Sequence, residues 1–443
     1  MPEEILHLAQ DFPPVPTAAW EAAIQKDLKG ADYEKKLVWR SEEGIAVRPY
    51  YRREDLAGQF PCVRDGQPWE ARGDAAFTPD AVRADRLHDA GAHAVQELGY
   101  ALAEGVERLA SGQQVEFVYA AGSNYFFEIA KLRAARLLWA QAAAAFGIDC
   151  AVRIHVRTSR LNKSLYDRYT NLLRATTEAM SAVIGGADTL YVEPFGFPPR
   201  LAGNVQNVLR EEAHLDAVAD PASGSYYIET LTDALAAQAW KLFQSVEREG
   251  GYSQALASGS IEKALEETRA ARRKTISSRR RTLVGVNNFP NAGEKTPEAE
   301  APSSEFDRLA EPFEAIRRRT AAHAKRTGRY PKVLLLKRGD LKMRMARANF
   351  CFNFLGCAGF DVVESEEYAA TDADLIVLCS SDPEYLSFAK EVCAAVSVPV
   401  LVAGNPKDQI GALKAAGVQG FLHISSDAVE TLTEWQTRLG IEA

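Results

Sequence analysis

The stretch KVLLLKRGDLKMRMARANFCFNFLGCAGFDVV, residues 332–363, contains the loop where a ligand site is most expected. An apolar run, Val333–Leu336, leads into a polar loop, and helical apolar spacing follows from Ala346 to Leu355. This order is typical of a doubly wound α/β domain, in which ligands bind at the carboxyl ends of the strands. The loop, residues 337–344, has no histidine, no cysteine and no glycine-rich turn. It therefore offers little for holding a metal ion or a phosphate group.

Other residue types that could do chemistry form no recognisable pattern. The six cysteines include no C-x-x-C pair and no Cys/His cluster, so we expect neither a zinc site nor a disulfide framework. No Ser/His/Asp or Cys/His arrangement has a spacing that predicts a nucleophilic site. A basic run is interpreted as a solvated or partner-facing stripe rather than an anion site; it comprises Arg272, Arg273, Lys274, Arg279, Arg280 and Arg281.

Length and composition narrow the class of protein. A chain of 443 residues with 47% hydrophobic and 25% charged residues is typical of a globular protein with two or three domains. A net charge of −8 argues against general binding to nucleic acid or anionic membranes. The acidic start has no apolar core, and no apolar run approaches the roughly 18 residues of a membrane span. We therefore expect a cytoplasmic protein with no membrane segment.

The first part of the chain predicts an N-terminal arm. The segment DFPPVP is extended, and Thr17 is expected to cap a helix over Ala18–Leu28 that Gly30 ends. Two short strands around a Glu-Glu-Gly turn follow within residues 35–51. Residues 59–84 show no strong pattern, and helical spacing then runs from Leu87 to Leu109.

Four strand–helix alternations make up the middle of the chain. Strands are predicted within residues 114–122, 150–158, 188–196 and 216–220, each followed by a helix: Asn124–Phe146, Asp167–Ile184, Pro199–Glu212 and Tyr227–Glu249. Such alternation indicates a parallel sheet, and four units are half of an eight-stranded barrel. Half a barrel would expose two open edges and an apolar inner face, so we expect something to complete it.

The last part predicts a five-stranded flavodoxin-like domain. Its expected strands are Val333–Leu336, Val362–Val363, Leu375–Leu378, Val398–Val402 and Gly420–His423. A helix from Ile261 to Ser277, a Pro/Glu/Ala/Ser linker over residues 290–304 and a helix from Glu305 to Lys325 precede it. The predicted fold class is α/β, a partial TIM-type β/α barrel plus a flavodoxin-like domain. The expected domains are a dimerisation arm (1–60), the truncated barrel (61–292), a linker with a helix (293–328) and the flavodoxin-like domain (329–443).

Several long segments resemble the methylmalonyl-CoA mutase family. They cover residues 11–51, 89–109, 124–140, 162–190, 219–243 and 283–291, and only residues 59–84 stand clearly outside. The resemblance implies a (β/α)₈ barrel that threads acyl-CoA, paired with a flavodoxin-like domain that carries adenosylcobalamin. The segments TSRLNKSLYDRYTNLL and LVGVNNFPN look more like the small, non-catalytic subunit of the heterodimeric members.

The same resemblance places a cobalt ligand in the loop over residues 337–344. Members that bind cobalamin have Asp-x-His-x-x-Gly there, in which the His is the lower cobalt ligand and the Asp orients it. In this sequence the three positions are Leu341, Met343 and Ala346. A thioether in place of an imidazole backed by a carboxylate implies that this chain does not hold cobalamin in the family's way.

Other cobalamin positions survive only as degenerate remnants. Lys337 matches a lysine of the same network, and Ser380 and Ser381 match a serine pair that lines the nucleotide tail. Gly404 matches one glycine of a pair whose other position is Ala403. Small residues at strand ends are also what tight βα turns require.

The barrel positions are eroded as well. The family's catalytic histidine falls on Arg86, and His88, two residues later, is interpreted as an ordinary polar residue at a helix start. An Arg and a Ser that hold the CoA chain fall on Gln114 and Glu116. The first four barrel strands, which supply the active-site Tyr, Gln and carboxylate-binding Arg, have no counterpart.

One barrel histidine is retained. His155 matches it, but Arg157 stands where the enzymes have Gln. A lone histidine on a buried strand is usually a core residue with its hydrogen bonds satisfied, and His155 is interpreted so. No residue of this chain is assigned a catalytic role.

The resemblance thus implies a small, non-catalytic subunit of an adenosylcobalamin-dependent methylmalonyl-CoA mutase. The large partner subunit would carry the cofactor, bind the acyl-CoA and interconvert (R)-methylmalonyl-CoA and succinyl-CoA. Nucleic acid and membranes are not expected partners. Two alternatives stay open: a self-standing mutase or isomerase with a noncanonical cofactor mode, and a binding or assembly module for cobalamin. The acyl-CoA used, and whether the half barrel pairs with the large subunit or with itself, are not specified by the sequence.

Overall fold

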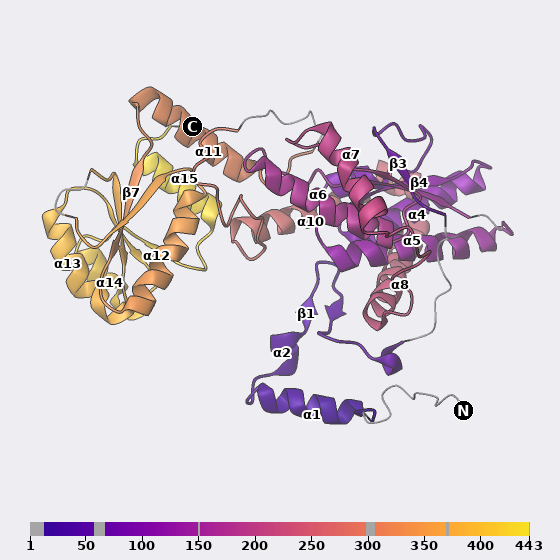
Figure 1. The fold of residues 1–443 in the computed structure, drawn as a ribbon, viewed down its shortest axis with the longest axis horizontal. Helices are drawn as coiled ribbons and strands as arrows, with labels where there is room; N and C mark the ends of the chain where they lie inside the picture. The colour runs from indigo at the N-terminus through magenta and orange to yellow at the C-terminus, as the bar shows by residue number, and fades with distance from the viewer. Residues whose placement is uncertain (1–12, 57–66, 149–150, 298–305, 369–371, 443) are drawn as a thin grey trace, which may run out of the picture.

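The computed structural model describes residues 13–56, 67–148, 151–297, 306–368 and 372–442. Figure 1 shows two lobes with α10 (Ser260–Ser277) between them, and an N-terminal arm that projects from one lobe. That lobe contains a four-stranded parallel sheet, and the other contains a five-stranded parallel sheet. Helix α11 (Glu311–Thr327) runs from the space between the lobes over this second lobe, where it packs on α15 (Ala428–Arg438). Within the described ranges, no helix is long and apolar enough to cross a membrane.

The arm consists of short elements with little core of their own. It comprises α1 (Thr17–Asp27), α2 (Tyr33–Leu37) and the antiparallel strands β1 (Trp39–Arg40) and β2 (Ala46–Val47), which confirms the predicted hairpin. The predicted cap is wrong, because Pro16 precedes α1 and the Thr17 hydroxyl donates to Glu54 instead. No residue of α1 is buried, and the Trp20 side chain is 44% exposed while stacked on Tyr50. An isolated helix of this length is marginal in water, so α1 lacks the packing that would stabilise it.

The four-stranded sheet has the order β3–β6–β5–β4. Its strands are β3 (Glu70–Arg72), β4 (Glu116–Ala121), β5 (Arg153–Thr158) and β6 (Thr189–Tyr191). The predicted strand at 216–220 is wrong: this segment forms turns and bends, with Val218 exposed. Its place in the sheet is taken by β3, from the region without a pattern, which follows the buried Trp69 and pairs with β6.

The helices of this lobe follow the predicted order. They are α5 (Tyr125–Ala145), α6 (Arg168–Ile184), α7 (Pro199–Asn207) with a π-helical turn to Glu212, and α8 (Tyr226–Arg248). The single helix predicted over residues 87–109 is two, α3 (Ala84–Asp89) and α4 (Ala94–Ala110). Gly91 separates them with a φ of 103°, where a Cβ would lie 2.9 Å from Cβ of Arg269. Helices α4, α5 and α8 pack on one another, and Phe117, Tyr119 and Trp139 are part of the core there.

The opposite face of the same sheet is not the apolar surface that was expected. Because side chains alternate along a strand, Glu116, His155 and Arg157 share this face, and they are polar. Residues before α3 cover part of it, since Phe77 and Ala81 pack against Val118. The expectation was wrong because only every second residue of these strands packs on the helices.

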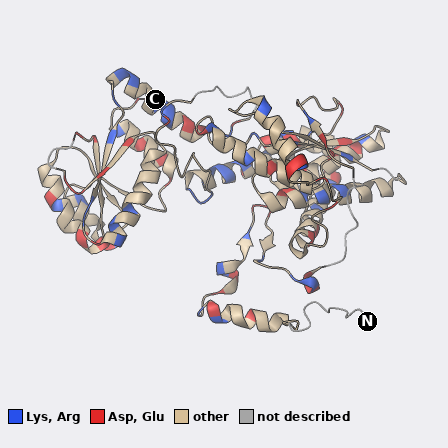
Figure 2. Ribbon diagram, in the orientation of Figure 1, with Lys and Arg blue, Asp and Glu red and all other residues tan. Residues whose placement is uncertain are grey.

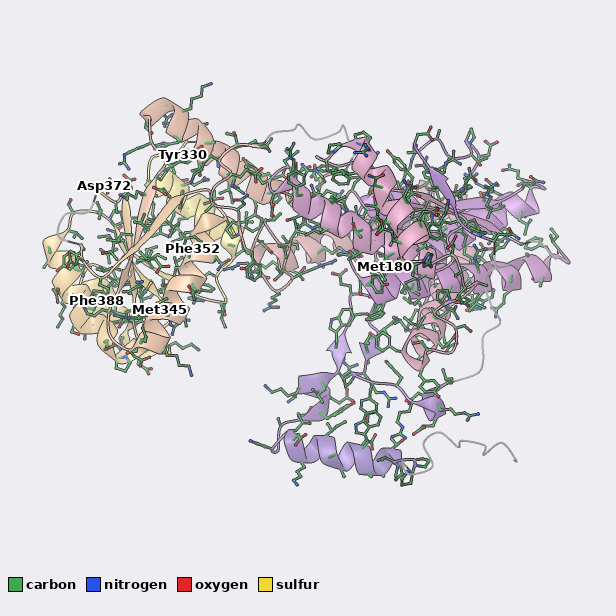
Figure 3. The ribbon with its side chains drawn as sticks, viewed as in Figure 1. Met180, Tyr330, Met345, Phe352, Asp372 and Phe388 are labelled. Atoms are coloured by element: carbon green, nitrogen blue, oxygen red, sulfur yellow. The ribbon has the colours of Figure 1, made fainter. Side chains whose placement is uncertain are left out.

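The five-stranded sheet has the order β11–β10–β9–β7–β8, with every pairing parallel. All five predicted strands are found: β7 (Lys332–Lys337), β8 (Asp361–Ser365), β9 (Leu375–Cys379), β10 (Val400–Ala403) and β11 (Gly420–Leu422). Helices α12 (Leu341–Gly356), α13 (Tyr385–Ala395), α14 (Ile410–Ala415) and α15 (Ala428–Arg438) surround it. The central strand β9 is buried throughout, and Phe388 of α13 is buried in this lobe (Figure 3). The strand order is consistent with the flavodoxin-like prediction.

The ion pairs of Arg157 on the polar face of the first sheet should stabilise the fold. Arg157 bonds Asp85 at 2.7 Å and also bonds Asp89, and all three residues are buried. Arg157→Met should lower the free energy of unfolding by about 3 kcal/mol, because it leaves the buried Asp89 without its guanidinium partner and Asp85 with Arg83 alone. Urea denaturation followed by circular dichroism measures the loss.

Arg153→Met is the matched control on the same strand. Arg153 pairs with Glu70 at 2.6 Å, but the two side chains are 50% and 56% exposed, so its loss should cost less than about 1 kcal/mol. Equal losses for the two variants would contradict the claim that the Arg157 network holds this face together.

Candidate functional site

The loop after β7 lacks the groups that the family uses to bind cobalt. Helix α12 begins at Leu341, and the Asp340 carboxylate accepts a 2.8 Å hydrogen bond from the N–H of Met343. Leu341 and Ala346 are exposed and Met343 is half-buried, so the three ligand-motif positions lie in the first two turns of a helix. Asp340 caps this helix and is not placed to orient a cobalt ligand.

The other cobalamin remnants have partners within the chain. Lys337 pairs with Glu364 at 2.8 Å. The Ser380 hydroxyl lies 2.8 Å from both the Arg338 carbonyl oxygen and Glu384 Oε2, and the Ser381 hydroxyl donates to the same carboxylate. A Cβ on Gly404 would lie 3.1 Å from Arg347 Nη1, so the Arg347 guanidinium packs directly against this glycine.

These contacts do not fit the nucleotide tail of a cobalamin. Hydrogen bonds from Ser381 and Ser380 lower the pKa of Glu384 to about 2. The hydroxyl groups of both serines are therefore already engaged by the Glu384 carboxylate. In the described parts of the chain, no group of three or more His, Cys, Asp or Glu residues is arranged to hold a metal ion. The residues present therefore do not fit adenosylcobalamin.

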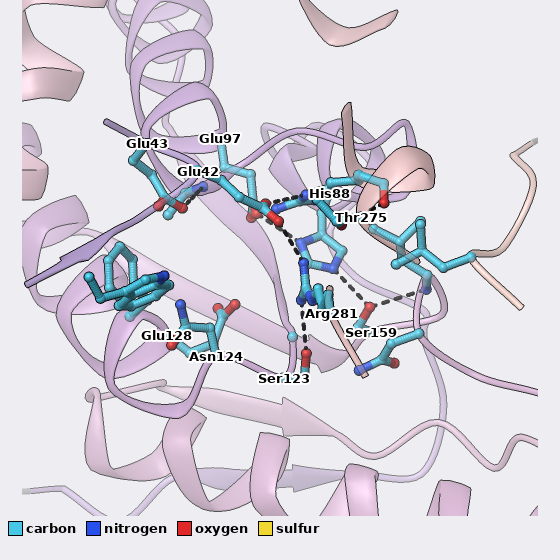
Figure 4. A pocket seen from close by; sticks show the side chains of 18 of the residues that line it. Glu42, Glu43, His88, Glu97, Ser123, Asn124, Glu128, Ser159, Thr275 and Arg281 are labelled. Atoms are coloured by element: carbon cyan, nitrogen blue, oxygen red, sulfur yellow. Dashed lines mark hydrogen bonds and ion pairs between the residues drawn. The ribbon is translucent and has the colours of Figure 1, made fainter. Parts of the chain in front are cut away.

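A cavity of about 470 Å³ lies at the carboxyl ends of β4 and β5 (Figure 4). The β1–β2 hairpin, α3, α4, the start of α5 and the end of α10 contribute to its wall. Its polar lining includes Glu42, Glu43, His88, Glu97, Ser123, Asn124, Glu128, Ser159, Arg280 and Arg281. In parallel α/β folds the carboxyl ends of the strands are the usual place for chemistry.

His88 lies in this cavity between a carboxylate and a hydroxyl. Its Nδ1 is 2.8 Å from Glu97 Oε1, and its Nε2 is 2.8 Å from Ser159 Oγ. All three residues are buried, so His88 is not the ordinary polar residue that its place in the sequence suggested. Residue spacing could not reveal this group, because Ser159 lies 71 residues after His88 and on another element.

A buried lysine holds the carboxylate of this group. Lys131 Nζ lies 2.8 Å from Glu97, 2.6 Å from Glu128 and 2.7 Å from the Ala120 carbonyl oxygen. Burial works to raise the pKa of Glu97, but the charge of Lys131 and the His88 ring outweigh it and lower the pKa. Glu97 Oε1 accepts a hydrogen bond when His88 Nδ1 carries the proton, and in that tautomer Nε2 is the acceptor for the Ser159 hydroxyl.

The residues that match the family's catalytic positions lie elsewhere. Arg86 and Gln114 are exposed, and neither contributes to the cavity. Glu116 accepts hydrogen bonds from Thr78 at 2.5 Å and from His155 Nε2 at 3.1 Å. His155 Nδ1 lies 2.8 Å from Thr189, so both of its ring nitrogens have partners.

The prediction that the basic run is a solvated or partner-facing stripe is wrong for Arg272 and Arg281. Arg272 is buried, pairs with Glu42 at 2.6 Å and donates to the Ala92 carbonyl oxygen at 2.9 Å. Arg281 pairs with the same carboxylate at 2.8 Å and donates to Ser123 at 3.2 Å. These two arginines form part of the cavity wall, so a solvated stripe is the wrong description for them.

This chain is similar to known proteins over most of its length. The family described as methylmalonyl-CoA mutase matches residues 63–329. A methylmalonyl-CoA mutase small subunit of Porphyromonas gingivalis is 32% identical over an alignment of 622 positions that takes in all of both chains. A methylmalonyl-CoA mutase small subunit of Streptomyces virginiae is 36% identical over 83% of this chain. A probable methylmalonyl-CoA mutase small subunit of Mycobacterium tuberculosis is 34% identical over 84% of this chain.

These relatives are longer than this chain. The Porphyromonas alignment exceeds the 443 residues here by 179 positions, so at least that many residues of that protein have no counterpart in this chain. The matched part makes up 64% and 66% of the Streptomyces and Mycobacterium proteins, just under two thirds of their length. The family match and the full-length relative together show that this chain belongs to the methylmalonyl-CoA mutase family.

Proposed function

We propose that this chain is the small, non-catalytic subunit of a heterodimeric adenosylcobalamin-dependent methylmalonyl-CoA mutase. The observation that carries the proposal is the loop after β7, where Leu341, Met343 and Ala346 replace the cobalt-binding motif and lie on a helix. Relatives named as small subunits at 32–36% identity support the assignment. The large partner subunit would hold the cofactor, bind the acyl-CoA and perform the interconversion of (R)-methylmalonyl-CoA and succinyl-CoA.

The polar face of the four-stranded sheet also supports a non-catalytic subunit. In this proposal residues 61–292 are a truncated TIM-type barrel, residues 329–443 a flavodoxin-like domain, and residues 293–328 their linker. The face that would line the acyl-CoA tunnel holds the Arg157–Asp85 pair and the Glu116–His155 pair, with Phe77 packed against His155. A CoA chain would have to displace these contacts. The alternative of a self-standing mutase has no comparable support.

The arm, residues 1–60, is proposed to contact the large subunit. Helix α1 buries none of its residues, and Val15, Trp20 and Trp39 expose apolar surface. Such surface is stabilised when a partner covers it. Figure 2 shows acidic and basic residues interspersed on both lobes, which together with the charge of −8 supports a protein partner rather than nucleic acid. A cytoplasmic location is part of the same proposal.

The cobalt-binding positions give one test. Titration of the isolated chain with adenosylcobalamin should leave the cofactor's own base on cobalt, because no imidazole replaces it at position 343. The visible spectrum and electron paramagnetic resonance of the reduced cofactor report the lower ligand. The large subunit is the positive control, and micromolar binding to this chain with displacement of the base would refute the assignment.

The arm gives a second test. Removal of residues 1–31, which include α1, should weaken the 1:1 complex with the large subunit by several kcal/mol, or about a hundredfold or more in Kd. Size-exclusion chromatography with light scattering and surface plasmon resonance measure the complex.

Ile424→Ala serves as the control for this deletion. Ile424 is 84% exposed in the other lobe, between β11 and α15, and its loss should leave the Kd unchanged. An arm deletion that binds as tightly as the full chain would show that the arm has another role.

A further inference from the structure

We propose that the cavity is a hydrolytic site in which Ser159 is an acyl-accepting nucleophile, His88 its general base and Glu97 the positioning residue. The substrates are small esters or thioesters whose acyl group carries a carboxylate. This activity goes beyond the proposed role as a mutase subunit and does not depend on cobalamin.

The three side chains have the order of a catalytic triad. Glu97, His88 and Ser159 form a carboxylate–imidazole–hydroxyl chain with 2.8 Å at each step. Distances of about 2.6–3.2 Å are what proton transfer between such groups requires. The same constellation occurs on unrelated folds and in any chain order, so geometry identifies it and sequence spacing does not.

Ser159 is held rigidly where β5 ends. Its backbone N–H donates to the Ala121 carbonyl oxygen at 2.8 Å, which ties it to the end of β4. Its hydroxyl oxygen accepts the N–H of Leu161 at 3.1 Å while it faces Nε2 of His88. Both Ser159 and His88 line the cavity, as Figure 4 shows.

Gly122 lets the histidine ring come close to the strand end. A Cβ at this position would lie 3.0 Å from Cε1 of His88 and 3.0 Å from Oε1 of Glu128. Contacts that short are tighter than most real ones, so a side chain at position 122 would press on the ring. A glycine here is consistent with an imidazole that must keep its position beside Ser159.

The start of α5 supplies donors for the negative charge of the intermediate. This 21-residue helix begins beside the cavity, where its N-cap Asn124 and the preceding Ser123 form part of the wall. The Asn124 side chain accepts no hydrogen bond from the first turn of the helix. Unpaired N–H groups at a helix start stabilise a developing oxyanion.

Arg280 is the group that defines the substrate class, because Arg281 is already paired with Glu42. Arg281 lies in the cavity wall beside Ser123, and Arg280 lines the same cavity and is exposed. Across the described residues, no carboxylate pairs with Arg280. A guanidinium without an acidic partner at the rim favours an acyl group that ends in a carboxylate.

The reaction balances without any other reagent. Ser159 Oγ attacks the carbonyl carbon as its proton moves to His88 Nε2, and the carbon–oxygen or carbon–sulfur bond to the leaving group breaks. The leaving group takes the proton from Nε2, and the acyl group remains on Oγ. Water then gives a proton to Nε2 and attacks the acyl carbon, and Oγ leaves with that proton, so an ester and water give an acid and an alcohol or thiol.

The test uses the full chain, free and in complex with the large subunit. A fluorophosphonate probe should label Ser159, identified by peptide mass spectrometry of the wild-type protein. Mono-p-nitrophenyl succinate should be hydrolysed, and Ser159→Ala and His88→Gln should each lower kcat by about a hundredfold or more. Arg280→Gln should raise KM for this substrate and leave KM for p-nitrophenyl acetate unchanged.

Ser181→Ala is the matched control, since Ser181 is also a buried serine but donates to the Glu178 carbonyl oxygen in α6, away from the cavity. It should keep wild-type hydrolysis and labelling. A probe adduct that maps to another residue, or hydrolysis by Ser159→Ala at the wild-type rate, would overturn the proposal. Because the readouts are ester hydrolysis and labelling, their failure leaves the mutase-subunit assignment untouched.

Discussion

The ammonium group of Lys131 is the point on which the first lobe depends. It is fully buried and reaches α4 through Glu97, its own helix α5 through Glu128, and the end of β4 through the Ala120 carbonyl oxygen. A charge removed from water is tolerated only with such partners, so the two helices and the strand must meet at this place. The orientation of Glu97 then sets the tautomer of His88 and the direction of its second nitrogen toward Ser159.

The two lobes differ in their potential ligand-binding groups. Where the family's cofactor would sit, Glu384 engages both serines and Arg347 lies across Gly404, so the five-stranded sheet keeps its order without the ligand groups. In the other lobe, the polar face of the four-stranded sheet carries salt bridges centred on Arg157. The cavity above β4 and β5 nevertheless keeps a dense set of ionisable groups. The first lobe thus contains a polar, organised pocket, away from the loop where the family binds cobalt.

Much of the fold could be predicted from the sequence. Strands β7, β9 and β10 of the second sheet were predictable because their apolar runs are almost entirely buried. Helices α5, α6 and α8 were predictable because their helical spacing is long and uninterrupted. Strand β3 could not be, since three residues, Glu70 to Arg72, carry no periodic signal. The segment 216–220 looked like a strand only because an acidic residue flanks each end of a short apolar stretch. The Glu97–His88–Ser159 group was missed for a different reason: its members meet only through the packing of α3, α4 and β5.

The cobalt content of the complex tests the subunit assignment most directly. The chain would be co-expressed with its large subunit, loaded with adenosylcobalamin, separated from free cofactor and analysed for metal and for protein mass. One cobalt per 1:1 pair, with none retained by this chain after dissociation of the pair, is the predicted result. Two cobalts per pair, or a cobalt that stays with this chain, would contradict the assignment of a subunit that carries no cofactor.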